Sequence, residues 1–166
     1  MPVDRLFAPW RGEYVSANSP VGTGEPRVCI FCVAPERYSE VNSLVVHVAA
    51  LNVVMMNRFP YSSGHTMVAP RRHLARLGDL TAEEREEMFA LAQRMESIYG
   101  EVYKPDGMNM GMNLGRAAGA GFADHIHLHL VPRWIGDSNF MTTTGETRVI
   151  PEDPAQACRR LREYFV

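Results

Sequence analysis

Histidine alternates with aliphatic residues along residues 125–131, which read His-Ile-His-Leu-His-Leu-Val. Successive side chains of an extended strand point to opposite faces, so His125, His127 and His129 would share one face and the aliphatic residues the other. A structural role explains this face poorly, because imidazoles fill cores badly and three protonated neighbours would repel one another. The segment therefore predicts a strand with chemistry on one face.

Three interpretations of the histidine face follow from the residues alone. The histidines could be exposed to solvent on an edge strand. Two or three of them could ligate a metal ion, as histidines do in catalytic zinc sites. The central one, His127, could be a nucleophile whose neighbours orient it, because a neutral imidazole can displace a good leaving group from phosphorus. The spacing does not separate the last two interpretations.

Composition narrows the class of protein. The chain has 166 residues, of which 46% are hydrophobic, and this predicts one soluble domain with a sizeable core. A net charge of −2 without a basic stripe argues against binding to long nucleic acid. No apolar run reaches the roughly 20 residues that cross a bilayer, so no membrane association is expected and the cytoplasm is predicted. With three cysteines, the close pair Cys29 and Cys32 favours reduced thiols or a bound metal.

The remaining pattern predicts an α+β fold with a mainly antiparallel sheet, a long central helix and a C-terminal helix. Residues 1–27 would form an irregular arm and residues 28–166 a single catalytic domain. Apolar periodicity predicts strands within 44–56, 65–70 and 108–114, the last with its methionines packed inward, and helices over 81–98 and 153–165. A capping box at Thr81–Glu84 and the Asp153-Pro154 pair mark the two helix starts.

The histidine strand resembles the signature of the histidine triad family of nucleotide hydrolases and transferases. Residues 57–70 resemble the family's upstream segment through Asn57, Pro60, Gly64-His65 and Pro70. Residues 118–125 and 131–141 are similar to the bacterial branch that includes diadenosine tetraphosphate phosphorylases. Diadenosine triphosphate hydrolases carry a glutamine shortly before the triad, where this chain has only glycine and alanine. The resemblance extends from Cys29 to Met141.

The resemblance implies a histidine triad fold and a nucleotidyltransferase that cleaves diadenosine tetraphosphate with inorganic phosphate to ATP and ADP. His127 would be the nucleophile that carries the adenylyl group, with His129 and His65 on the phosphate oxygens. The implied substrate contacts are Asn57 at the ribose, Asn113, Gly119, Ala120 and Gly121 at phosphate, and Arg133 and Trp134 beside them. Turn or strand-end bonding is the alternative for both asparagines, a salt bridge for Arg133 and a subunit contact for Trp134.

The family also pairs such cysteines with histidines in a zinc site, here Cys29, Cys32, His73 and His125. Four protein ligands would make the zinc ion structural, and no organic cofactor is implied. The partners would be an adenine dinucleoside polyphosphate, phosphate, and further copies of the chain in a homodimer or homotetramer. Three alternatives stay open: a hydrolase of the same or a related adenylyl compound, a nucleotide-binding sensor without turnover, and a metalloenzyme that uses all three histidines.

Overall fold

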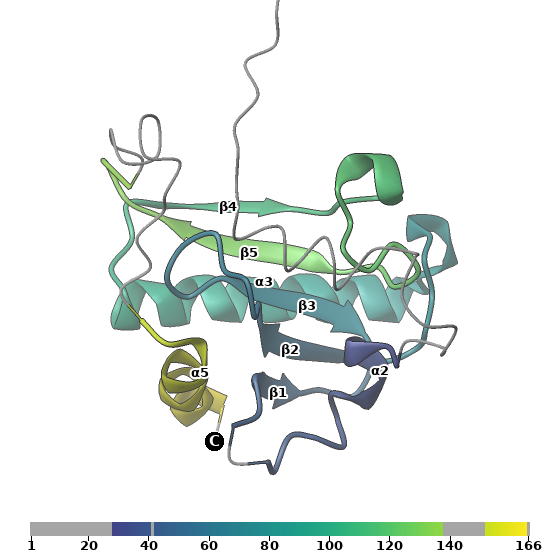
Figure 1. The fold of residues 1–166 in the computed structure, drawn as a ribbon, viewed down its shortest axis with the longest axis horizontal. Coiled ribbons are helices and arrows are strands. Elements are labelled where there is room, and N and C mark those ends of the chain that lie inside the picture. Colours follow the sequence, from purple (N-terminus) through teal and green to yellow (C-terminus); the bar gives the residue numbers. More distant parts are fainter. Residues whose placement is uncertain (1–27, 41, 138–151, 166) are drawn as a thin grey trace, which may run out of the picture. The chain divides into compact units, whose positions relative to one another are not determined.

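The computed structural model describes residues 28–40, 42–137 and 152–165. Of these, 28–134 and 152–165 belong to one compact unit, which holds the sheet and helices labelled in Figure 1. The predicted N-terminal arm, residues 1–27, lies outside the described residues. Within the described ranges, no helix is long and apolar enough to cross a membrane.

A five-stranded sheet forms the centre of this unit, and each strand runs antiparallel to its neighbours. In spatial order the strands are β1 (Val45–Val48), β2 (Asn52–Met56), β3 (Thr66–Pro70), β5 (Leu128–Arg133) and β4 (Gly107–Gly111). This arrangement confirms the α+β class and the strand regions predicted before the histidine segment.

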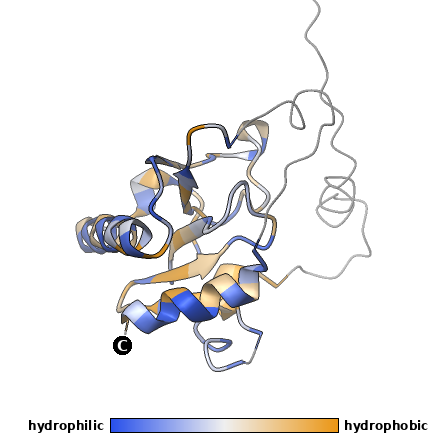
Figure 2. Ribbon diagram, turned by 90° about the vertical axis from the view of Figure 1, so that its left-hand side faces the viewer, coloured by the Kyte–Doolittle hydropathy of each residue, from blue (hydrophilic) through white to orange (hydrophobic). Residues whose placement is uncertain are grey.

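Helices α2 (Ile30–Val33), α3 (Ala82–Val102) and α5 (Pro154–Arg162) accompany the sheet, with short 3₁₀ helices at Leu77–Asp79, Arg116–Ala118 and Glu163–Phe165. The capping box is present at α3, because the Thr81 hydroxyl accepts from the Glu84 amide and the Glu84 carboxylate accepts from the Thr81 amide. At α5 the Asp153 carboxylate caps the helix by accepting from the Ala155 and Gln156 amides, so both predicted helix starts are confirmed. Figure 2 shows hydrophobic colours along much of the sheet and mixed colours around the helices, as expected for helices with one buried face.

The two faces of the sheet bury different sets of side chains. The larger core lies on the side of α3 and α5 and includes Ile126, Leu128 and Leu130. The opposite face packs against Phe31 of α2 and includes Met67. His129 lies directly opposite Met67 across the β3–β5 pair, so it shares this second face. The predicted separation of aliphatic and histidine side chains is therefore confirmed.

Strand β5 begins at Leu128, three residues later than the alternating pattern predicted. The β3–β5 register ends at Val68 and Leu128, and two residues further it would bring Pro70 opposite Ile126. Proline has no N–H to donate to a ladder. The Ile126 amide instead donates to the Leu74 carbonyl at 2.8 Å, so residues 125–127 leave the ladder.

The methionines along 108–114 point inward only in part. Met108 and Met112 pack against the larger core, whereas Met110 is 47% exposed. Strand β4 is an edge strand, with a neighbour on one side only, and this leaves its middle uncovered. The inward prediction is therefore wrong for Met110.

Candidate active site

The buried imidazole of His127 is held in one tautomer by the backbone two residues before it. Its Nδ1 lies 2.9 Å from the backbone carbonyl oxygen of His125. A carbonyl oxygen can only accept, so Nδ1 carries the proton and donates it. The neutral ring therefore keeps an unprotonated Nε2 with a lone pair, which is the atom that a nucleophile or a metal ligand would use.

A second chain of hydrogen bonds fixes the protons on His65 and His129. The Tyr61 amide donates to Nδ1 of His65 at 3.0 Å, so the proton of His65 lies on Nε2. That Nε2 donates to Nδ1 of His129 at 2.9 Å, which places the proton of His129 on its own Nε2. The buried Nε2 of His129 has no hydrogen-bond partner within the described residues. It is an N–H donor available to a ligand oxygen.

Both ring nitrogens of His65 are thus already engaged, which differs from the expectation that His65 contacts phosphate directly. Its geometry instead orients His129. Helix α3 holds the residues on both sides of His65. The buried Tyr99 hydroxyl donates to the Gly64 carbonyl at 2.7 Å and accepts from the Thr66 hydroxyl at 2.6 Å. Gly64 has φ 76°, and a Cβ there would lie 2.9 Å from the Tyr103 ring, so only glycine fits before His65.

Burial keeps these imidazoles neutral. It lowers the pKa of His65 to about 3, helped by the proximity of His129 and His127. It also lowers the pKa of His129 to about 4, with a smaller contribution from His127, and lowers the pKa of His127. At neutral pH the three rings therefore keep the lone pairs and N–H groups that their hydrogen bonds assign.

A second cluster brings together the four residues predicted to hold zinc, Cys29, Cys32, His73 and His125. Their ligand atoms all lie within 4.8 Å of one another. Nδ1 of His125 lies 3.2 Å from the Cys29 sulfur, 3.6 Å from the Cys32 sulfur and 3.3 Å from Nδ1 of His73. The Cys32 sulfur lies 3.3 Å from Nδ1 of His73.

These separations fit a tetrahedral ion. Bonds of about 2.0 Å to nitrogen and about 2.3 Å to sulfur place two nitrogen ligands about 3.4 Å apart and nitrogen about 3.5 Å from sulfur. The proton of His125 is also out of the way, because its Nε2 donates to the Pro70 carbonyl at 2.8 Å and leaves Nδ1 as a lone pair facing the sulfurs.

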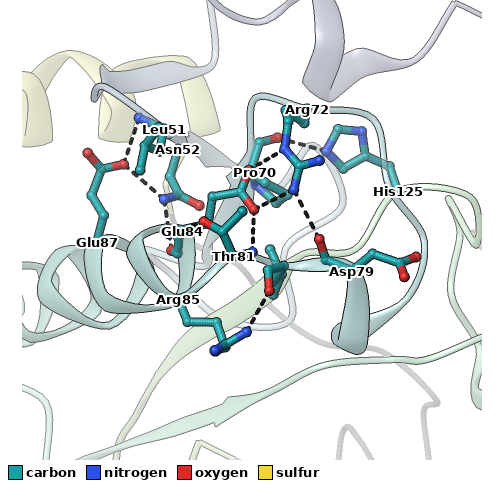
Figure 3. Close-up of polar contacts among 11 residues, drawn as sticks. Leu51, Asn52, Pro70, Arg72, Asp79, Thr81, Glu84, Arg85, Glu87 and His125 are labelled. Carbon is teal, nitrogen blue, oxygen red and sulfur yellow. Dashed lines mark hydrogen bonds and ion pairs between the residues drawn. The ribbon is translucent and has the colours of Figure 1, made fainter.

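An ion pair between Arg72 and Glu84 anchors the loop that carries His73 (Figure 3). The guanidinium makes two bonds to the buried carboxylate, of 2.6 and 2.7 Å, and a third to the Asp79 carbonyl at 3.0 Å. The Arg72 bonds are the largest of the causes that hold the pKa of Glu84 below its usual value. His73 follows the anchored arginine directly, so the capped start of α3 fixes one ligand of the cluster.

Several of the residues predicted to contact the substrate bond to other parts of the protein. The Asn57 side chain accepts from the Phe59 amide at 2.9 Å, which is the turn bonding given above as its alternative. The Gly119 amide donates to the Arg116 carbonyl at 3.0 Å and is therefore engaged, unlike the expectation for this loop. Arg133 donates to Asn109 on β4 at 2.6 Å, and Trp134 lies edge-on to Tyr103.

Residues Asn113, Ala120 and Gly121 are partly buried. Three aromatic residues of the site were not predicted: Phe31, Tyr61 and Tyr99. Phe31 stacks on His127, the Tyr61 ring lies over His65 and His129, and Tyr99 holds Gly64. The position of Phe31 between the two cysteines was the one available signal in the sequence.

The comparisons with known proteins agree with this geometry. The family model described as the HIT domain matches residues 38–134, more than half of the chain. The chain belongs to the histidine triad family. A Mycobacterium tuberculosis protein named AP-4-A phosphorylase is 38% identical over 157 residues, which cover 90% of this chain and 78% of the relative. A bis(5'-adenosyl)-triphosphatase of Dictyostelium discoideum is 35% identical over 83 residues, 50% of this chain and 55% of the relative.

A solved histidine triad structure from Mycobacterium smegmatis, described as zinc-bound, superposes with a TM-score of 0.64 at 30% identity. It covers 82% of this chain and 91% of that one. The histidine triad fold and the family resemblance are both confirmed.

Proposed function

We propose that this chain is a diadenosine tetraphosphate phosphorylase, which uses inorganic phosphate to release ATP and ADP. The observation that carries the proposal is the tautomer of His127, whose lone pair on Nε2 is fixed by the bond from Nδ1 to the His125 carbonyl. A nucleophile of this kind splits one difficult displacement into two easier ones. The Mycobacterium tuberculosis relative named AP-4-A phosphorylase supports phosphate rather than water as the acceptor.

In the first step, Nε2 of His127 attacks the α-phosphorus, and the bond to the β-phosphate oxygen breaks with its electron pair on the departing ATP. The positive charge that develops on the imidazole is stabilised by the His125 carbonyl at Nδ1. The Nε2–H of His129 would donate to a non-bridging oxygen, where charge accumulates in the transition state. His65 would act through His129 by keeping that proton in place.

In the second step, a phosphate oxygen attacks the same phosphorus, the bond to His127 breaks, and ADP leaves. The stretch before the triad has glycine and alanine where the triphosphate hydrolases carry glutamine, and the smaller side chains would leave space for phosphate. Asn57, Asn113, Ala120, Gly121, Arg133 and Trp134 are the proposed substrate contacts. For the Gly119 amide, the bond to Arg116 would have to open first.

We also propose that Cys29, Cys32, His73 and His125 hold a zinc ion. The donor set and the separations of its atoms support this assignment. Zinc with four protein ligands supplies a structural cross-link between the segment before β1, the loop after β3 and the start of the triad. The nucleophile of the proposed reaction is not among its ligands, which argues against a catalytic metal held by all three histidines.

Two further proposals concern assembly and location. We propose a homodimer or a homotetramer that uses the edge strand β4, where Met110 is 47% exposed, and Leu114 just after it, which is 49% exposed. An uncovered edge strand with apolar side chains is prone to pair with another copy. Sedimentation of Met110→Lys tests this, since a monomer is expected. We place the chain in the cytoplasm because cysteines at the proposed zinc site must stay reduced.

Product analysis of diadenosine tetraphosphate, incubated with and without inorganic phosphate, tests the main proposal. We expect ATP and ADP only when phosphate is present, and loss of both with His127→Ala. His47→Ala, which removes a histidine on β1 outside the site, should retain the activity. ATP and AMP without phosphate would make the chain a hydrolase. No turnover, with nucleotide binding retained in His127→Ala, would make it a sensor.

A further inference from the structure

Phe31 connects the metal cluster to the histidine proposed as nucleophile. It lies between Cys29 and Cys32 in the sequence and is only 1% exposed. Its ring stacks on His127 with centroids 4.8 Å apart and planes 27° apart. The same ring lies 5.0 Å from His125, a cluster residue, and meets Phe122 edge-on at 6.0 Å. One side chain therefore touches both the cluster and the nucleophile.

The helix that carries Phe31 has little to hold it in place apart from this cluster and its own packing. Helix α2 has four residues, and the Cys29 side chain makes no capping hydrogen bond within the described part of the chain. A helix this short is marginal without tertiary contacts. The cysteines at either side of Phe31 are the points at which a bound ion would fix the segment to His73 and His125.

The imidazole of His127 needs such a support. Its bond to the His125 carbonyl fixes one nitrogen, yet the ring can still tilt about that bond. A flat ring stacked almost parallel to it limits the tilt and so sets the direction of the Nε2 lone pair. Small errors in that direction matter, because a misplacement of about 1 Å can slow an enzyme about 100-fold.

We propose that Phe31 is a positioning residue through which occupancy of the Cys29/Cys32/His73/His125 cluster sets the orientation of His127. The consequence for rate rests on the proposed function, whereas the structural coupling does not. The alternative role of Phe31 is purely structural, because it also packs in the core on this face of the sheet with Val45, Val53 and Met67. In that case its replacement would affect stability alone. The two roles differ in whether the effect of zinc on His127 depends on the phenyl ring.

The first experiment needs no substrate. Zinc is titrated into metal-free protein labelled with ¹⁵N in its histidine rings, and the Nδ1–H signal of His127 is followed in the wild type and in Phe31→Leu. We expect zinc to shift and sharpen this signal in the wild type and to leave it almost unchanged in the variant. An equal change in both would overturn the proposal, since it would show that the effect passes through the His125 backbone instead.

The second experiment measures single-turnover adenylylation of His127 by diadenosine tetraphosphate, with and without zinc. Removing zinc should slow the wild type by about tenfold and Phe31→Leu by less than about twofold, because the two changes act through one contact. Zinc-loaded Phe31→Leu should also be about tenfold slower than wild type, with an unchanged Kd for the substrate. A weaker Kd with an unchanged rate would instead assign the ring to substrate binding.

Controls separate these outcomes from misfolding. Phe89→Leu removes a ring that is 50% exposed on α3 and should match the wild type in both experiments. If Phe31→Leu fails to bind zinc, Phe122→Leu replaces it, since this variant removes the ring that meets Phe31 edge-on. Phe122→Leu should reduce the change that zinc causes in the Nδ1–H signal of His127. No reduction would overturn the proposal. If the wild type forms no adenylyl-histidine, the proposed function fails, and the first experiment still decides the role of Phe31.

Discussion

Acid should destabilise this protein through the buried pair His65 and His129. Burial lowers the pKa of His65 to about 3 and that of His129 to about 4, whereas histidine in an unfolded chain titrates near 6.5. Between these values the unfolded chain binds protons that the folded protein does not. The stability is therefore fully present above about pH 6.5 and is lost as the pH falls toward 4.

The loss can be estimated from the two pKa values. Each unit of pH below 6.5 costs about 1.4 kcal/mol per histidine, so the pair costs about 4 kcal/mol between pH 7 and pH 5. Urea denaturation at the two pH values measures the total, to which carboxylates and the metal cluster also contribute. His65→Asn should lower the pH dependence by about 2 kcal/mol and leave those other contributions unchanged.

The test therefore compares the change in the free energy of unfolding between pH 7 and pH 5 in the wild type with the same change in His65→Asn. Parallel pH dependences for the two proteins would refute the reasoning, because they would mean that His65 titrates alike in the folded and unfolded states. His47→Asn is the matched control, since this histidine lies half-buried on β1 and should change the pH dependence less.

Three shorter predictions concern the triad, the metal and the loop before His73. His129→Asn should slow adenylylation of His127 by about 10²–10³, the usual effect of losing one transition-state donor, whereas a variant with wild-type single-turnover rates would exclude the proposed contact. Chelation of zinc should lower the free energy of unfolding by several kcal/mol, measured by urea titration, and an unchanged midpoint would mean that the cluster does not bind the ion. Glu84→Gln should lower the free energy of unfolding by about 1–3 kcal/mol, because Arg72 loses its buried charged partner. Glu83→Gln, at an exposed position, is the control. Equal urea midpoints for the two variants would contradict the role of the Arg72–Glu84 pair.

Local pattern was enough to predict the elements that carry the site. Alternation gave the two faces of the histidine segment, and side-chain capping gave the starts of α3 and α5, because each depends on residues a few positions apart. The late start of β5 and the exposure of Met110 could not be predicted in this way. They depend on position in the folded sheet: Pro70 would lie opposite Ile126 if the β3–β5 register continued, and Met110 stands on the edge strand β4.

The site itself was predictable as a set of residues but not as a set of roles. His65 and His129 are 64 positions apart in the chain, and Phe31 reaches His127 from a segment 96 positions away. Which hydrogen bonds form at such distances depends on the fold. The resemblance gave the identity of the four cluster residues, whereas only the structure gives the separations of their ligand atoms.

The three histidines of the 125–129 segment differ in the nitrogen that each leaves available, and their hydrogen-bond partners decide this. His125 donates from Nε2 to Pro70, so its Nδ1 faces the thiols. His127 donates from Nδ1 to the His125 carbonyl, so its Nε2 keeps the lone pair that the proposed nucleophile needs. His129 accepts at Nδ1 from His65, so its Nε2 is a donor. Identical side chains thereby present a lone pair to the thiols, a lone pair at the proposed nucleophile and an N–H donor, because burial keeps each ring neutral and each partner fixes one proton.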